Sequence, residues 1–272
     1  MVSFIILSTF DATRRQKGTV MNLLLTNDDG YQQPGLLALA RAADRLGHRG
    51  MIVAPYVQQS AKSQSFTLTR PLFVHEQPAA TDHFPVYAIE GTPTDCARIG
   101  LQKLMKDPVD VVISGINYGW NLGTAVYYSG TFGAAREGAF HHVPSIAVSA
   151  HEQATPAMIA YFAEQTILIA EKLVKQSLPR NTVFNLNFPQ CAPEECLKLK
   201  QAPLDSAFFA DTYVAYDTPR AGRCYFMEAG VKTEPTDLGS DVDLVRQGYP
   251  VFTVVGGVQS VDSPDLVNLL DR

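Results

Sequence analysis

The stretch Met21-Asn22-Leu23-Leu24-Leu25-Thr26-Asn27-Asp28-Asp29-Gly30 decides the fold of this chain. Its first six residues form a short, mainly apolar run, which predicts a buried strand. Pro34 then opens Gly35–Leu46, where apolar residues recur at helical spacing, and Gly47 is placed to end that helix. A buried strand followed by a helix is the unit from which parallel sheets are built.

The same alternation continues along the chain. Because the strands are near-continuous apolar runs, it predicts an α/β fold with a mostly parallel sheet and helices on both faces. The further strands are expected at Gly50–Ala54, Val109–Ser114, Ser145–Ser149 and Thr182–Phe188, and the further helices at Thr94–Met105, Thr131–Phe140 and Pro156–Gln176.

Two regions depart from this pattern and are expected to lie outside the main sheet. Residues 65–90 predict a β-hairpin insertion, and residues 198–272 predict a β-rich C-terminal arm that serves oligomerisation, which leaves 21–197 as the core. Residues 1–20 are expected to be a poorly ordered extension before a natural start at Met21. The strand-like segments are Phe66–Thr69, Leu72–His75, Val86–Ile89, Tyr213–Val214, Arg223–Glu228 and Val251–Val255.

Length, charge and cysteine content limit the class of protein. A chain of 272 residues can bury a full core, and a net charge of −5 argues against a broad nucleic-acid footprint. The apolar run Phe4–Phe10 is too short to span a bilayer. The four scattered cysteines predict reduced, unligated thiols and hence a cytoplasmic protein, although Cys191 and Cys196 resemble half of a zinc site.

Asp28 and Asp29 follow the first strand directly, at the sheet edge where ligands bind. Asn-Asp-Asp-Gly also suits a hairpin turn, but the next segment is helical rather than a returning strand. Capping of that helix by one aspartate is the remaining alternative. Two adjacent carboxylates repel each other unless a positive charge lies beside them, so a divalent cation is favoured.

A second polar strand end is Ser114-Gly115-Ile116-Asn117, where Asn117 offers a neutral oxygen to a hard cation. The loop beyond it ends at Ser129-Gly130-Thr131, where a helix N-terminus would suit a phosphate, with a plain Ser or Thr cap as the alternative. Ser60 could ligate the cation and Lys62 could neutralise phosphate. Residues 91–95 read as a cap by Thr94 or Asp95 or as a substrate contact, and His141-His142 as a surface pair.

These motifs together resemble the SurE survival protein family of 5′/3′-nucleotidases. The resemblance rests on Leu23–Gly30 with Pro34-Gly35, on Gly91-Thr92-Pro93-Thr94-Asp95-Cys96, on Ser114–Asn117, on Asn121-Leu122-Gly123 and on Tyr128–Thr131. It covers roughly Met21 to Val255 in the family's order. It implies a Rossmann-like core, and dimers or tetramers built through exchanged arms.

The resemblance also implies the site. The metal ligands would be Asp28, Asp29, Ser60 and Asn117, and their oxygen atoms favour Mg²⁺ or Mn²⁺ over zinc. Asp28 and Asp29 are the expected catalytic residues, one of them orienting the attacking water, with a phospho-aspartate route as the rival. The expected substrate contacts are Asn27, Lys62, Ser114, Gly115, Ser129, Gly130 and Thr131.

The expected activity is the hydrolysis of nucleoside 5′-monophosphates, and of 3′-monophosphates as well. An exopolyphosphatase, a broad phosphomonoesterase using the same site, and a non-catalytic nucleotide-binding module are the alternatives. No nucleic-acid or membrane partner is expected.

Overall fold

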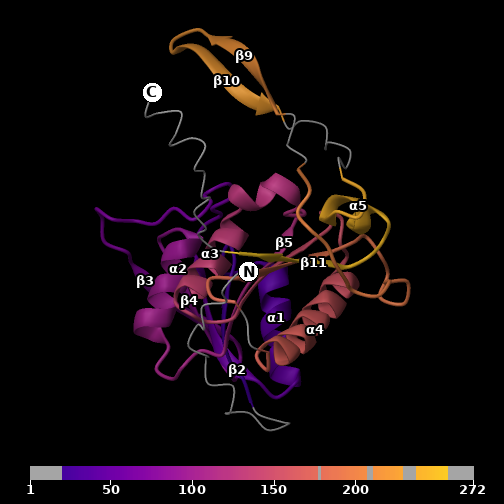
Figure 1. Ribbon diagram of the computed structural model, residues 1–272. Helices are drawn as coiled ribbons and strands as arrows, with labels where there is room; N and C mark the ends of the chain where they lie inside the picture. The colour runs from indigo at the N-terminus through magenta and orange to yellow at the C-terminus, as the bar shows by residue number, and fades with distance from the viewer. Residues whose placement is uncertain (1–19, 177–178, 207–210, 229–236, 257–272) are drawn as a thin grey trace, which may run out of the picture.

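The computed structural model describes residues 20–176, 179–206, 211–228 and 237–256 (Figure 1). Residues 1–19 of the expected extension and 257–272 of the expected arm lie outside them. Nine strands of the described part form one sheet, in the order β3-β4-β2-β1-β5-β6-β7-β11-β8. These strands are β1 Asn22–Thr26, β2 Arg49–Pro55, β3 Val74–Thr81, β4 Phe84–Ile89, β5 Val111–Tyr118, β6 Ser145–Ala150, β7 Val183–Phe188, β8 Lys200–Gln201 and β11 Val251–Val255.

The middle of this sheet is parallel and the chain changes direction within it. Strands β4, β2, β1, β5, β6 and β7 are parallel neighbours. From β1 the chain builds outward through β2 to β4, and then returns to the other side of β1 with β5. Such a point of reversal leaves a crevice at the carboxyl ends of the two strands.

Helices cover both faces of the sheet, as predicted. Helices α1 (Pro34–Arg45) and α4 (Pro156–Leu173) pack on one face, and α2 (Pro93–Ile99) and α3 (Gly130–Phe140) on the other. Alternation within β1 separates the two layers: Leu23 and Leu25 join the α1–α4 core, and Leu24 joins the α2 side.

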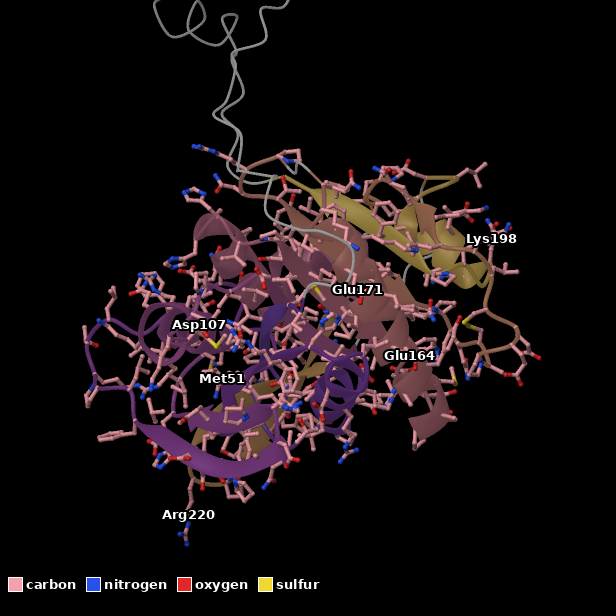
Figure 2. The ribbon with its side chains drawn as sticks, turned by 90° about the horizontal axis from the view of Figure 1, so that it is seen from below. Met51, Asp107, Glu164, Glu171, Lys198 and Arg220 are labelled. Atoms are coloured by element: carbon pink, nitrogen blue, oxygen red, sulfur yellow. A yellow bond between two sulfur atoms is a disulfide. The ribbon has the colours of Figure 1, made fainter. Side chains whose placement is uncertain are left out.

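Helices α1 and α4 are also joined by polar contacts at their surface. Arg45 of α1 pairs with Glu164 at 3.4 Å, and His48, just beyond α1, meets Glu171 at 3.0 Å. Figure 2 labels Glu164 and Glu171 on α4. The Arg45–Glu164 pair is exposed and contributes little to stability, and the His48 ring is itself buried, so burial of side chains holds the layers together.

Shorter helices complete the connections. Helix α2 continues into a π-helical turn, η2 (Gly100–Leu104), so that the two together match the predicted helix Thr94–Met105. A 3₁₀ helix, η3 (Gly123–Tyr127), precedes α3, and α5 (Asp241–Arg246) precedes β11. Among the described residues no helix is both long and apolar enough to cross a membrane.

The β-hairpin within residues 65–90 exists, but its expected place outside the main sheet is wrong. Strand β4 pairs in parallel with β2, and β3 pairs with β4 at the sheet edge. The physical reason is burial: Phe84, Val86 and Ala88 place one apolar face of β4 in the core. No strand forms at Phe66–Thr69.

The region after residue 198 is likewise only partly an arm. Strand β11 pairs antiparallel with β7, because Val251 and Thr253 are buried against the core, and β8 pairs with β11. Only β9 (Thr212–Thr218) and β10 (Gly222–Glu228) form a separate two-stranded sheet, which projects from the body (Figure 1).

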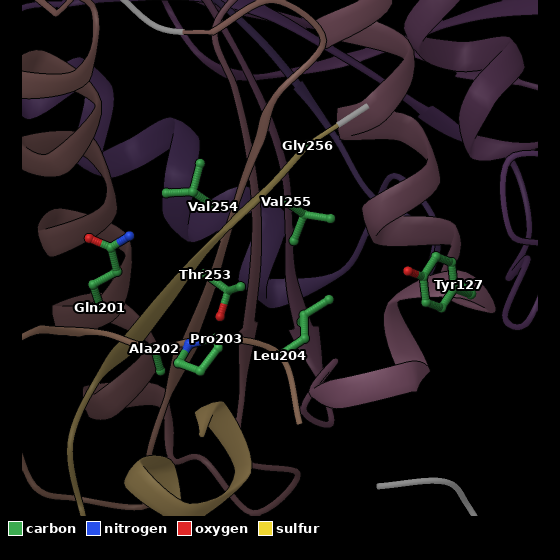
Figure 3. Close-up of a pocket in the computed structure, with 9 residues that line it drawn as sticks. All are labelled: Tyr127, Gln201, Ala202, Pro203, Leu204, Thr253, Val254, Val255 and Gly256. Atoms are coloured by element: carbon green, nitrogen blue, oxygen red, sulfur yellow. The ribbon is translucent and has the colours of Figure 1, made fainter. Parts of the chain in front are cut away.

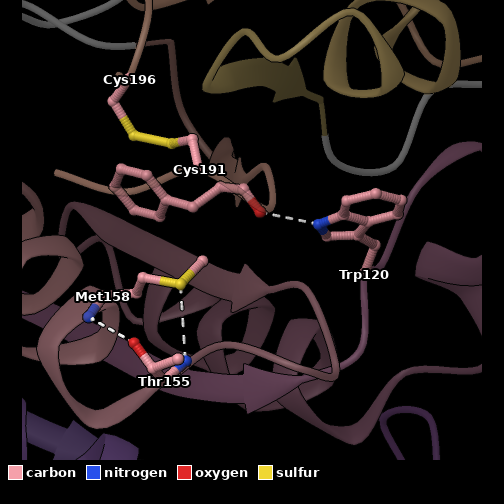
Figure 4. The surroundings of a disulfide bond; sticks show 6 residues. Trp120, Thr155, Met158, Cys191 and Cys196 are labelled. Carbon is pink, nitrogen blue, oxygen red and sulfur yellow. Dashed lines mark hydrogen bonds between the residues drawn. A yellow bond between two sulfur atoms is a disulfide. The ribbon is translucent and has the colours of Figure 1, made fainter. Parts of the chain in front are cut away.

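The prediction of four reduced cysteines is wrong for one pair. Cys191 and Cys196 form a disulfide with their Cα atoms 5.5 Å apart (Figure 4). A turn in which Cys196 N–H bonds Ala192 C=O brings the two together, which their spacing alone does not reveal. Cys96 and Cys224 are free thiols.

Candidate active site

The two polar strand ends singled out in the sequence lie side by side. Thr26 of β1 is in register with Ser114 of β5. The segments that continue from them, Asp28-Asp29 and Asn117-Tyr118, therefore meet at the point where the strand order reverses. The two segments also interact electrostatically, because the Asp29 carboxylate, together with burial, raises the pKa of Tyr118.

Asp28 lies buried against the beginning of α3. Thr131 Oγ1 donates a hydrogen bond to Asp28 Oδ1 at 2.6 Å. Gly130 leaves the room for this approach, because a Cβ atom there would lie 2.8 Å from Asp28 Cβ and 2.9 Å from Oδ2. The pKa of Asp28 is raised to about 6, chiefly by burial; the hydrogen bond from Thr131 opposes this rise and the charge of Asp29 adds to it.

The turn that carries the aspartates is held by Asn27. Asn27 Nδ2 donates to Gly30 C=O at 2.9 Å, and Gly30 N–H donates to Asn27 Oδ1 at 3.1 Å. Gly30 has φ +110°, a conformation that favours glycine. Gln33, not an aspartate, is the N-cap of α1. The capping alternative for Asp28 and Asp29 is therefore excluded.

Asp29 is less buried than Asp28 and has weaker local support. Gln58 Nε2 donates to Asp29 Oδ1 at 3.4 Å, which lowers a pKa that burial raises. Within the described part of the chain, neither aspartate forms an ion pair with a basic side chain. Two neighbouring carboxylates thus lack a compensating positive charge, which is the electrostatic setting of a cation site.

Asn117 suits the neutral place in such a site. Its Nδ2 donates to Gly119 C=O at 2.7 Å, and its Oδ1 makes no hydrogen bond with the described residues. In those residues no three His, Cys, Asp or Glu side chains gather. The available donors are therefore two carboxylates and neutral oxygens, a set that fits Mg²⁺ or Mn²⁺.

The loop after β2 spans the site between the aspartates and α3. Gln59 N–H donates to Asp28 C=O at 2.7 Å, and Ser63 N–H donates to Tyr128 C=O at 3.0 Å. Between these anchors, Ser60 and Lys62 are exposed, and among the described residues neither side chain forms a hydrogen bond or ion pair with Asp28 or Asp29. The structure brings their loop to the site without placing the two side chains in it.

The residues at the start of α3 also cap the helix. Ser129 Oγ accepts a hydrogen bond from Phe132 N–H at 3.1 Å, so Ser129 is the N-cap of α3, as the plainer alternative held. The Thr131 hydroxyl is occupied by Asp28. The Thr131 backbone N–H also faces the Asp28 carboxylate, whose pKa it lowers, so the Gly130 N–H is what this end of α3 offers to an anion.

Ser114 and Gly115, which were expected to contact the substrate, are both buried. Ser114 is fully buried and its hydroxyl has no hydrogen-bond partner among the described residues. Gly115 has φ +139°, and a Cβ atom there would run into the carbonyl of Val148. Close packing of β5 on β6 thus accounts for this glycine.

The remaining motifs are structural in the described chain. Thr92 caps α2 and Asp95 completes a capping box, which corrects the choice of Thr94 or Asp95 as the cap. His141 lies 3.4 Å from Glu137 and His142 is exposed, in keeping with a surface pair. Thr94 is buried without a hydrogen-bond partner in the described part.

Two residues near the aspartates were not predicted from the sequence. Gln58 donates to Asp29 from the loop after β2, and Tyr118, the last residue of β5, has a pKa that the Asp29 carboxylate raises. The available signal was their position at or shortly after the end of a strand. Polar side chains there are ordinary, so only the strand order shows which of them converge.

A hollow in the surface lies away from the two aspartates. It has a volume of about 770 Å³, and Figure 3 shows it between Tyr127 and the segments Gln201–Leu204 and Thr253–Gly256. Neither Asp28 nor Asp29 lines it. This hollow is therefore separate from the candidate site.

Comparison with known proteins agrees with this geometry. The model of the family "Survival protein SurE" matches residues 23–210. The chain is 36% identical over 239 residues to 5′-nucleotidase SurE of Desulfovibrio desulfuricans, covering 86% of this chain and 91% of that one. It is 38% identical over 228 residues to 5′-nucleotidase SurE of Heliobacterium modesticaldum, covering 84% and 83%.

A solved structure extends the agreement to the fold. The crystal structure of SurE protein from Aquifex aeolicus superposes with a TM-score of 0.78 at 30% identity, covering 92% of this chain and all of that one. The matched region contains both polar strand ends and the start of α3. The chain therefore belongs to the SurE survival protein family.

Proposed function

We propose that this chain hydrolyses nucleoside 5′-monophosphates to a nucleoside and phosphate, with a divalent cation as cofactor. One observation carries the proposal: Asp28 and Asp29 lie at the reversal point of a parallel sheet, against the start of α3, with no basic partner in the described residues. Relatives whose sequences align with most of this chain are named 5′-nucleotidases.

Oxygen atoms of Asp28, Asp29, Asn117 and Ser60 would hold the cation. Of these, Asn117 Oδ1 and the two carboxylates support the assignment most directly, because among the described residues that Oδ1 accepts no hydrogen bond and the carboxylates have no basic partner. The oxygen-only set favours Mg²⁺ or Mn²⁺. A bound cation would stabilise negative charge on the phosphate and lower the pKa of water.

The chain's own residues would position the reactants. Thr131 fixes one oxygen of Asp28, and a carboxylate oxygen of Asp28 or Asp29 that is not used as a ligand would orient the attacking water and accept its proton. The phosphate would lie toward Gly130 and Thr131 at the α3 N-terminus, with Lys62 supplying a positive charge from the loop above. Asn27 supports the turn rather than the substrate.

An assay panel tests the activity and its scope. Release of phosphate from 5′-AMP, 3′-AMP and short polyphosphate is measured with Mg²⁺, with Mn²⁺ and with EDTA. We expect metal-dependent hydrolysis of 5′-AMP, slower hydrolysis of 3′-AMP, and loss of both with EDTA. Preference for polyphosphate would make the chain an exopolyphosphatase, and binding of AMP without any hydrolysis would make it a non-catalytic module.

A homodimer or homotetramer is also proposed. The hairpin β9–β10 projects from the body, and several of its large side chains are 54–66% exposed among the described residues. A second copy would bury them if the hairpins were exchanged between subunits. These side chains are Tyr213, Tyr216, Tyr225, Phe226 and Met227.

A cytoplasmic location is the last part of the proposal. The free thiols of Cys96 and Cys224 suit a reducing compartment, whereas the Cys191–Cys196 disulfide does not, because cytosolic thiols are normally kept reduced. Cell fractionation with alkylation of thiols at lysis tests both. We expect the protein in the cytoplasmic fraction with Cys96 and Cys224 alkylated and with Cys191 and Cys196 protected by their disulfide, and recovery from an oxidising compartment would overturn the assignment.

A further inference from the structure

A second hollow, of about 270 Å³, lies on the α2 side of the sheet. Helix α2 and the π-helical turn η2 form one wall, and the loop at Phe66–Leu72 forms the other. Neither Asp28 nor Asp29 lines it. Its apolar lining comes from Phe66, Leu68, Leu72 and Ile99.

Two cations line the same hollow, and only one is compensated. Arg98 lies over the Phe66 ring, 4.6 Å from its centroid, and its Nε is 3.6 Å from the buried carboxylate of Glu137. Lys103 is exposed and has no partner within the described residues. One positive charge thus stands free beside an apolar surface.

The single acidic side chain of the lining does not cancel that charge by contact. Both carboxylate oxygens of Asp95 accept hydrogen bonds, Oδ1 from Thr67 N–H at 2.9 Å, and Oδ2 from the Thr67 hydroxyl at 2.7 Å and Thr92 N–H at 3.0 Å. Asp95 therefore fastens the loop to α2. The rim remains apolar and cationic.

The exposed apolar side chains, the π-helical turn and the volume of the hollow also indicate a ligand site. Phe66 and Leu68 are 44% and 81% exposed although they are large and apolar. Lys103 projects from a π-helical turn, a rare feature that occurs frequently at functional sites. The volume of about 270 Å³ lies just below the usual range of about 300–1,000 Å³ for ligand pockets, which limits the ligand to a small molecule.

We propose that this hollow is a second nucleotide site, which binds a nucleoside monophosphate with its base against Phe66 and Leu68 and its phosphate toward Lys103. A flat ring with one phosphate group matches an apolar wall beside a single free cation. The choice of a nucleoside monophosphate rests on the proposed function. The evidence that a ligand binds here, the apolar and cationic lining, is independent of that function.

Photolabelling tests the site without turnover. The intact protein is irradiated with 8-azidoadenosine 5′-monophosphate in EDTA, digested with trypsin, and the labelled peptides are identified by mass spectrometry. Label in the hollow falls on the peptide of residues 63–98. Label at the candidate active site falls on the peptides of residues 18–41, 50–62 or 107–136. The two proposals can therefore fail independently.

We expect saturable label on residues 63–98, competed by AMP and much less by adenosine or inorganic phosphate alone. Lys103→Gln should weaken this labelling about ten-fold, whereas Lys106→Gln, also exposed but outside the lining, should not. Leu68→Asp should weaken it too, and because Leu68 is 81% exposed the change leaves the core intact. Label that does not saturate, or that Lys103→Gln and Leu68→Asp leave unchanged, overturns the proposal.

Discussion

The Thr131 hydroxyl donates a hydrogen bond to Asp28 Oδ1 at 2.6 Å, although the two residues are 103 positions apart in the chain. This bond joins the end of β1 to the start of α3. It leaves Asp28 Oδ2 for another partner and fixes the direction in which that oxygen points. Thr131 is thus a positioning residue for the carboxylate on which the proposed chemistry depends.

Replacement of Thr131 should therefore impair catalysis more than folding. For Thr131→Val we expect kcat/KM for 5′-AMP to fall roughly 10–100-fold, the usual range when a hydrogen-bond partner of a metal ligand is lost. Thr131→Ser keeps the hydroxyl and should retain most of the activity. Steady-state kinetics at several metal concentrations checks both, and full activity of the valine variant would contradict the assigned role.

Gly130 should tolerate no side chain. In Gly130→Ala the new methyl group would lie within 3 Å of Asp28 Cβ and Oδ2, so the carboxylate must move. We expect at least a roughly ten-fold loss of kcat/KM, because displacement of a reacting group costs rate steeply. Far-ultraviolet circular dichroism serves as the control for folding. A folded alanine variant with wild-type kinetics would show that Asp28 need not hold its place.

Removal of the exposed aromatic side chains should alter self-association. The double variant Tyr225→Ser/Phe226→Ser removes two rings that are 62% and 64% exposed on β10. We expect light scattering to report a smaller assembly than for the wild type. Leu238→Ser is the matched control, because Leu238 is 96% exposed but lies outside the hairpin. Equal mass for all three proteins would exclude the hairpin as the interface.

Asp241 should matter for stability. Its carboxylate accepts from the backbone N–H groups of Gly123, Asp205 and Val242, at 2.9, 2.8 and 2.9 Å. In Asp241→Ala these donors lose their acceptor inside the protein, which should lower the free energy of unfolding by about 3 kcal/mol. Asp107→Ala, at an exposed site, should change it by less than about 0.5 kcal/mol. Urea denaturation measures both variants.

Asp241 also gives the stability a pH dependence of known sign. Burial raises the pKa of its carboxyl above the ordinary value of 3.8, so the folded chain holds this proton to higher pH than the unfolded chain. The stability that the protonated Asp241 carboxyl group contributes is fully present below pH 3.8. It is lost as the pH rises through the folded-state pKa of Asp241. Asp241→Asn does not titrate. The wild type should therefore lose stability relative to this variant as pH rises from 3.8, and a constant or opposite difference would contradict the sign.

Much of the core could be predicted because its signals are local. The apolar run before Asp28, the helical spacing after Pro34 and the long apolar period of Pro156–Gln176 each indicate one element, and the structure forms β1, α1 and α4 there. The place of β4 and β11 in the main sheet could not be predicted. Which strands pair depends on contacts between distant segments, and an alternating pattern fits an edge strand and a separate hairpin equally well.

The site was predictable in part for the same reason. Residue type and position at a strand end identify Asp28, Asp29 and Asn117 as candidates. They do not reveal that Thr131 bonds Asp28 or that Gln58 bonds Asp29, since these contacts arise from the strand order. The turn that joins Cys191 to Cys196 is similarly invisible in the spacing of two cysteines.

The most direct test of the account is Mn²⁺ binding, measured together with AMP hydrolysis on the same samples. Wild type, Asp28→Asn, Asp29→Asn and Asn117→Ala are titrated by calorimetry, with Asp107→Asn as an exposed control. The account predicts one Mn²⁺ site per chain in the wild type and in the control, with affinity and hydrolysis lost together in both aspartate variants and weakened in Asn117→Ala. Undiminished Mn²⁺ binding and hydrolysis in Asp28→Asn and Asp29→Asn would contradict it.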